Sequence, residues 1–180
     1  MTGKRPESIG DIFDMNRQIR EGLLAVISPV SEDAAARLPD GETWSIAGIV
    51  EHISIVDQGT AWICSKLLKK AQEDGTRSTG VLAVTDTFRQ KTREMSGTRL
   101  EAPERVQPTG QVPLEDSIKK MAATAAVFDE VREGLESFEL ASHTFPHPYF
   151  GELTAPEWLL IAGGHELRHT KQIQERLIQA

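Results

Sequence analysis

The sequence predicts an all-α protein built as a four-helix bundle with long connections. Four segments repeat apolar residues at the spacing of one helix face, and β-branched alternation is too sparse to predict a sheet. The chain has 180 residues, of which 39% are hydrophobic, so it is long enough to bury a core. Because this length suits one folding unit, we expect a single domain over residues 1–180.

The first two predicted helices lie in the N-terminal half of the chain. Residues 8–27 carry their apolar side chains on one broad stripe, and Pro29 stops the helix. The segment SPVSEDAAARLPDGET then reads as a connection. Residues 45–71 form the second predicted helix, for which Ser45 is a favourable N-cap.

The other two predicted helices lie in the C-terminal half. The third covers residues 113–135, where a proline and two acidic residues suit a helix start. The fourth runs from Thr154 nearly to Ala180, and Thr154 and Glu157 have the spacing of a capping box.

Two long connections join these helices. Residues 72–112 are rich in Gly and Pro, and we expect one short helix within them, at about Thr85–Met95. Residues 139–153 predict an irregular loop or a small hairpin. Connections of this length usually carry function or a crossover.

Charge and composition exclude several classes of function. The 20 Lys and Arg residues are outnumbered by 27 Asp and Glu residues, and a net charge of −7 argues against nucleic-acid binding. No apolar run approaches a membrane span, and the N-terminus lacks the apolar core of a secretory signal. The single cysteine, Cys64, excludes an internal disulfide and a multi-cysteine zinc site. We therefore expect a cytoplasmic protein with neither a nucleic-acid nor a membrane partner.

Three histidines interrupt the apolar faces of two predicted helices. His165 and His169 lie one turn apart and about 40° apart in azimuth, and His52 lies on the inward stripe of the second helix. Burying an imidazole without a partner costs about 1–3 kcal/mol. Two explanations stay open on the residues alone: each histidine has its own hydrogen bond in the core, or they share a metal ion.

The segment from His165 to His169 also matches H-E-x-x-H, the motif of zinc proteases in which the glutamate is the general base. Such proteases take a third ligand downstream. The residues after His169 contain no histidine, and their only carboxylate is Glu175. We therefore expect Glu166 to be solvated or to contact a metal ligand rather than the metal itself, and not to act as a base.

The sequence around these histidines resembles the DinB-like superfamily, the damage-inducible or YfiT-like group of four-helix bundles. The resemblance is carried by W-S-I-A-G-I-V-E-H-I at 44–53, F-G-E-L-T-A-P-E-W-L-L-I at 150–161 and G-H-E-L-R-H-T-K-Q-I at 164–173. It covers nearly the whole chain, in the order helix, His-bearing helix, long connection, helix, H-x-x-x-H helix.

This resemblance implies a divalent metal, nickel or zinc, bound by His52, His165 and His169. Known activities in the family are small-thiol S-transfer with bacillithiol, mycothiol or glutathione, and a mycothiol-dependent isomerisation. We therefore expect a small thiol and a small electrophile as substrates, with the metal activating the thiol. The alternatives are a stress-response protein that binds metal or ligand without turnover, and a metal-dependent hydrolase that uses bound water. The resemblance also implies a homodimer, with Leu159 and Leu160 as apolar outer positions of the last helix.

Two residues beside the histidines are candidates for supporting roles. Gln172 falls about 20° from His165 around the helix, so it can orient a ligand or pack between helices. Arg168 is expected to form an ion pair, with binding of a substrate carboxylate as the alternative.

The remaining candidates are expected to be structural. Cys64 lies about 120° from His52 around the helix and reads as a small apolar side chain. His147 is expected to pack in its loop against Pro148, with an approach to the mouth of the bundle as the alternative, and His143 receives no role. Packing roles or positions off the histidine face are expected for Trp44, Glu51, Trp158, Gly163 and Gly164.

Overall fold

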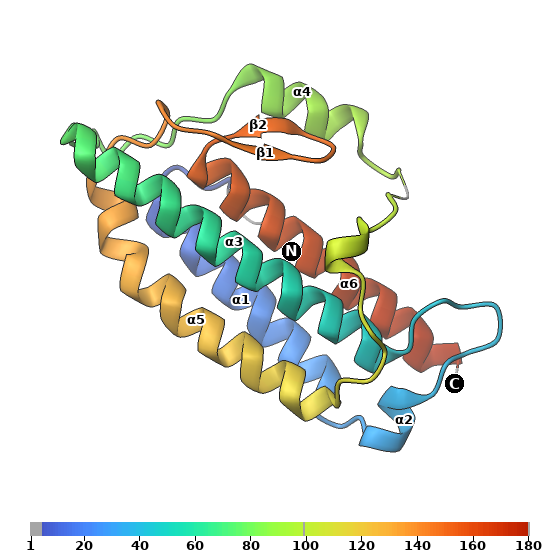
Figure 1. Cartoon of the computed structure of the whole chain (residues 1–180). Helices are drawn as coiled ribbons and strands as arrows, with labels where there is room; N and C mark the ends of the chain where they lie inside the picture. The colour runs from blue at the N-terminus through green and yellow to red at the C-terminus, as the bar shows by residue number, and fades with distance from the viewer. Residues whose placement is uncertain (1–4, 99, 180) are drawn as a thin grey trace.

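Four long helices pack side by side and form the predicted bundle (Figure 1). The computed structural model describes residues 5–98 and 100–179. The long helices are α1 (Ile9–Ile27), α3 (Ile46–Asp74), α5 (Leu114–Ser137) and α6 (Ala155–Gln179). The shorter elements are α2 (Glu32–Ala36), α4 (Asp86–Glu94), η1 (Glu104–Val106), β1 (Phe145–His147) and β2 (Gly151–Leu153). Residues 1–4, 99 and 180, including the predicted helix end at Ala180, lie outside the described residues, and the single domain stays a prediction.

The helix starts follow the capping chemistry of the sequence. Ser8 forms a reciprocal capping box with Asp11 at the start of α1, and the Ser45 hydroxyl accepts from the Gly48 N–H at 3.1 Å. The predicted short helix is also present as α4, with Thr85 as its N-cap. The positions of the four long helices and of α4 are therefore confirmed.

Three details of the predicted helices differ from the structure. The connection after Pro29 contains the short helix α2, which Ser31 caps. The capping box of α6 is half formed, since the Thr154 N–H donates to Glu157 but the Thr154 hydroxyl has no partner. Leu177, which continues the apolar spacing of α6 in the sequence, is 38% exposed rather than buried.

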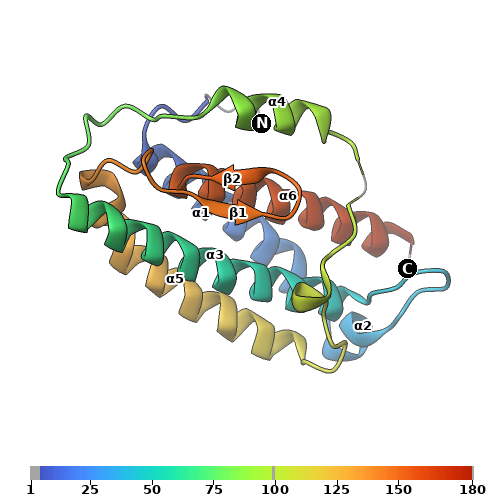
Figure 2. The ribbon, with the colours of Figure 1, turned by 45° about the horizontal axis from the view of Figure 1, so that its top comes forward.

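The hairpin alternative for residues 139–153 is confirmed, and the hairpin and α4 lie together outside the bundle. β1 and β2 pair antiparallel, with Phe145 opposite Leu153. The carboxylate of Glu157, at the start of α6, accepts from the N–H and hydroxyl of Thr85 and from the N–H of Thr154. One buried glutamate thus joins α4, the hairpin and α6, and Figure 2 shows these elements grouped on one side of the bundle.

Two apolar clusters fill the bundle, one towards each end. The first includes Phe13 and Leu67 and continues under the hairpin and α4. The second includes Leu23 and Ile49 and continues under α2. Among the described residues, no helix is both long and apolar enough to cross a membrane.

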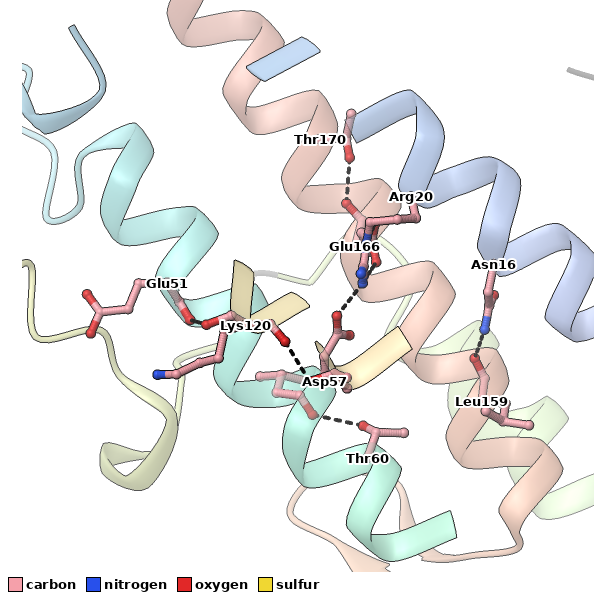
Figure 3. Close-up of polar contacts among 12 residues, drawn as sticks. Asn16, Arg20, Glu51, Asp57, Thr60, Lys120, Leu159, Glu166 and Thr170 are labelled. Atoms are coloured by element: carbon pink, nitrogen blue, oxygen red, sulfur yellow. Dashed lines mark hydrogen bonds and ion pairs between the residues drawn. The ribbon is translucent and has the colours of Figure 1, made fainter. Parts of the chain in front are cut away.

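A polar belt of Arg20, Asp57 and Glu166 lies between the two clusters (Figure 3). Arg20 donates from Nε and Nη2 to the two carboxylate oxygens of Glu166, at 2.7 Å each, and Nη2 also contacts Asp57. Each carboxylate side chain is only 6% exposed. Since one guanidinium compensates only one of two buried carboxylates, burial still raises the pKa of Asp57 to about 6. The belt ties α1 to α3 and α6 at mid-height.

Candidate metal centre

Three imidazole rings from α3 and α6 converge on one point between these helices. The Nε2 atoms of His52 and His165 are 2.9 Å apart, and those of His165 and His169 are 3.2 Å apart. The ring centroids lie between 4.5 and 5.1 Å from one another. The structure thus brings together three residues that the sequence separates by up to two-thirds of its length. That they ligate a metal stays a prediction at this point.

His52 is fixed from both sides by elements outside its own helix. Its Nδ1–H donates to the carbonyl oxygen of Val106, in η1, at 2.6 Å. The ring of Trp44, just before α3, lies 4.9 Å from the His52 ring, centroid to centroid. Because a carbonyl can only accept, the ring proton is on Nδ1, and the Nε2 lone pair of His52 faces the other two histidines.

His169 is fixed in the same manner by its own helix. Its Nδ1 lies 2.8 Å from the side-chain oxygen of Gln172, three residues further along α6. The ring proton is therefore on Nδ1, and Nε2 is again left with a lone pair. Of the two roles open to Gln172 in the sequence, the structure supports the first, with the His169 ring as the group that Gln172 orients.

The triad of His52, His165 and His169 fits a metal ion. The rings of His52 and His169 aim their Nε2 lone pairs at one point, where His165 and Arg168 are the available donors and a bound cation would take the place of both hydrogen bonds. A tetrahedral site with metal–nitrogen bonds of about 2.0–2.1 Å holds its ligand nitrogens about 3.3 Å apart. The observed separations of 2.9 and 3.2 Å are close to that spacing.

Burial keeps the three rings neutral, which is the form that binds metal. Burial lowers the pKa of His169 to about 3, and the charge of Arg168 contributes further. The pKa of His52 is lowered by burial, and that of His165 lies well below its usual value because burial and the neighbouring histidines act together. At pH 7 the triad therefore offers lone pairs rather than positive charge.

Arg168 lies against the triad instead of forming the expected ion pair. Its Nη2 atom is 3.0 Å from Nε2 of His169, and among the described residues it has no carboxylate partner. Partial burial lowers its pKa without removing its charge. The structure thus places a guanidinium without a carboxylate partner against one of the three triad rings.

The two glutamates beside the triad are engaged elsewhere. Glu51 accepts from the N–H and hydroxyl of Thr109 and from the N–H of Gly110, at 2.8 to 3.0 Å, and so anchors the connection over the triad. Glu166 is 4% exposed and belongs to the polar belt. The prediction of a solvated Glu166 is therefore wrong, because Arg20 offers it a buried bidentate partner.

The other candidates lie apart from the triad nitrogens. Cys64 is fully buried, and burial raises its pKa to about 12, so its apolar role fits the structure. His143 pairs with Asp74 at 2.7 Å, outside the site. Leu159 is 2% exposed, so its assignment to an outer face of α6 is wrong, and the homodimer stays a prediction without that residue. Trp158 is a core residue, as expected.

Some contributors to the site carry no signal in the sequence. Val106 acts through its carbonyl oxygen, and any residue in η1 could supply that group. Arg20 sits among exposed polar residues in the pattern of the first helix. The one available signal was Asp57, a charged residue within the mostly apolar stretch of α3.

The fold and the triad define a four-helix-bundle protein with a candidate metal centre between two of its helices. The chain belongs to the DinB superfamily, which it matches over residues 15–173. It is 26% identical over 155 residues to the uncharacterised protein YuaE of Bacillus subtilis (strain 168), covering 81% of this chain and 85% of YuaE. The solved structure of TT2238, a four-helix bundle protein, has a TM-score of 0.61 and 20% identity, covering 93% of this chain and 99% of TT2238. The second similarity concerns the fold alone.

Proposed function

We propose that this protein is a metal-dependent S-transferase that joins a small thiol to a small electrophile, with nickel or zinc at His52, His165 and His169. The convergence of three neutral Nε2 atoms carries the proposal. Three imidazoles leave coordination positions open for a substrate. Nitrogen donors suit zinc, nickel, copper or iron and disfavour magnesium and calcium, which prefer oxygen.

The protein's own residues hold and orient the reactants. The Val106 carbonyl and the Gln172 side chain fix the tautomers of two ligands, so that their Nε2 atoms stay aimed at one point. Arg168 offers a positive charge beside that point to an anionic group of either reactant. When bound, the metal lowers the pKa of a coordinated thiol, so that thiolate is available near neutral pH. The thiolate sulfur forms a bond to the electrophilic carbon as a leaving group departs, and the thiol proton goes to solvent.

The positions of the acidic residues favour transfer over hydrolysis. A zinc hydrolase of the H-E-x-x-H type needs its glutamate free beside the metal. Here Glu166 is held by Arg20, and Glu51 is held by the connection over the triad. A mechanism in which metal binding alone lowers the pKa of the attacking thiol needs no such base. Because Cys64 is buried in the core, the thiol has to come from solution.

The first experiment tests the metal. The untagged protein is purified and its metal content is measured by elemental analysis, beside His169→Ala and the control His143→Ala, which removes a histidine outside the triad. We expect about one nickel or zinc per chain in the wild type and in His143→Ala, and little in His169→Ala. Unchanged metal in His169→Ala would refute the site.

The second experiment tests the reaction. A panel of small thiols is offered with monochlorobimane, which loses chloride when the carbon–sulfur bond forms. Thiol-dependent turnover that is lost in His52→Ala and retained in His143→Ala supports the proposal. Cleavage of esters without any thiol would favour the hydrolase, and stoichiometric metal without turnover would favour a binding protein.

A further inference from the structure

His147 ends β1, and the hairpin turn fixes the orientation and tautomer of its ring. Its Nδ1 accepts from the backbone N–H groups of Tyr149 and Phe150, at 3.2 and 3.4 Å. An accepting nitrogen carries no proton, so the neutral ring bears its hydrogen on Nε2. Burial lowers the pKa of His147 to about 4, so the ring is neutral at pH 7. His147 is therefore a fixed neutral donor at Nε2.

This donor lies on the same face of α6 as the triad. The His147 ring packs 5.0 Å from the Trp158 ring, centroid to centroid. Trp158 precedes His165 by seven residues, which is two turns on one helix face and about 10 Å along the axis. Through Trp158, His147 therefore lies about two turns of α6 from the triad.

The Nε2–H group of His147 makes no hydrogen bond to the described residues of the protein. This nitrogen is also not one of the fully buried polar atoms that lack a partner, so solvent can reach it. The neighbouring turn residue Tyr149 donates its hydroxyl to the Glu101 carbonyl, which ties the hairpin to the connection that leads to η1. The free Nε2–H thus lies where the hairpin and the connection meet.

Arg105, in η1, adds a charge on the connection that Tyr149 ties to the hairpin. It is exposed, and the described residues give it no carboxylate partner. Its charge acts on His147, and the next residue, Val106, holds His52. In a chain of net charge −7, an exposed guanidinium on the connection that meets the hairpin, together with a free N–H donor on that hairpin, is suited to an anion.

We propose that His147 and Arg105 form a subsite that binds the carboxylate of the small molecule held at the triad. This inference rests on the proposed function, because it names which thiols the site prefers: carboxylate-bearing ones. The Nε2–H of His147 donates to one carboxylate oxygen, and the Arg105 guanidinium supplies charge and further donors. Both act on specificity and neither touches the sulfur.

The test is calorimetric binding to the metal-loaded protein with three probes. 3-Mercaptopropionate carries thiol and carboxylate, 3-mercaptopropionamide is its neutral counterpart, and propionate lacks the thiol. Because a hydrogen bond to a charged group is worth about tenfold to a hundredfold in affinity, we expect the wild type to prefer mercaptopropionate over the amide by that factor. We expect His147→Phe and Arg105→Met each to lose most of this preference.

Two further variants separate recognition from folding. His147→Gln keeps an N–H donor near the Nε2 position and should restore part of the preference, which a purely structural role of the imidazole would not predict. His143→Phe changes the other histidine of this loop, outside the site, and should leave the preference intact. A thermal melt of each variant establishes that it is folded.

The outcomes distinguish this inference from the proposed function. If both thiols bind equally, or if the preference survives His147→Phe and Arg105→Met, the subsite is refuted while thiol binding stands. If mercaptopropionate binds no more tightly than propionate, and both bind in a His147-dependent manner, the subsite stands and thiol binding at the triad is refuted. If no probe binds, both are refuted.

Discussion

Replacing Arg20 by methionine should destabilise the protein strongly, because Arg20 is the only cation among the described residues that pairs with the two buried carboxylates. The side chains of Asp57 and Glu166 are each 6% exposed. Removing one partner of a buried ion pair costs about 3–5 kcal/mol. For a domain of this size each kcal/mol lowers Tm by about 2–4 °C, so we expect a loss of about 6–20 °C at neutral pH.

The loss should also depend on pH in a defined direction. With Arg20 in place, burial already raises the pKa of Asp57 to about 6, above the unfolded value of 3.8. Removing the cation raises that pKa further. A carboxyl group with a raised pKa in the folded state costs no stability when the pH is below its pKa in the unfolded state. The folded state loses stability as the pH rises from the unfolded-state pKa to the folded-state pKa. Arg20→Met should therefore be less harmful at pH 5 than at pH 8.

The assay is urea unfolding of wild type and Arg20→Met at pH 5 and pH 8. Arg132→Met is the control, since Arg132 pairs with Asp14 and Glu136, whose side chains are 57% and 40% exposed. Exposed pairs are worth less than about 1 kcal/mol. A loss for Arg20→Met that matches this control, or that is the same at both pH values, would refute the reasoning.

Three further predictions concern packing, metal affinity and protonation. Gly163→Ala should cost about 1–3 kcal/mol in urea unfolding, because its new Cβ would overlap Asn16 Oδ1, whereas Gly164→Ala meets no atom within 4 Å and should gain up to about 1 kcal/mol. Gln172→Leu should weaken metal binding about 10- to 100-fold by competition with a chelator, since His169 loses its Nδ1 partner; unchanged affinity would contradict that role. In the metal-free protein, His169 has a folded pKa of about 3, below its unfolded value of 6.5. The unfolded chain then binds more protons between these values, so His169 should cost about 2 kcal/mol of stability at pH 5 relative to pH 8, and His169→Phe should lose this part of the pH dependence.

The bundle itself could be predicted because its signals are local. Helical periodicity and capping residues such as Ser8, Ser45 and Thr85 act within one or two turns, and the structure confirms each of these helix starts. The errors arose where tertiary partners decide. Leu159 is buried rather than exposed because the first apolar cluster covers it.

The candidate site could be predicted only in part. The spacing of His165 and His169 fixes their common face, but nothing in the residues alone shows that α3 meets α6 at the height of His52. Family resemblance supplied that link. The orientation of each ring depends on acceptors from elsewhere, a backbone carbonyl in η1 for His52 and a side-chain amide for His169. Such acceptors leave no recognisable pattern in a single sequence.

The polar belt has a consequence for the alignment of the helices. Asp57 follows His52 by five residues on α3, and Glu166 directly follows His165 on α6. Because the Arg20 guanidinium bonds to both carboxylates, it also limits how far α6 can shift along α3. A slide of one turn, about 5.4 Å, would pull the rings of His52 and His165 out of reach of a common ion. The side chains of Arg20, Asp57 and Glu166 thus set the relative positions of the triad rings without contacting them. Substitutions in the polar belt should therefore change the metal affinity of the triad first.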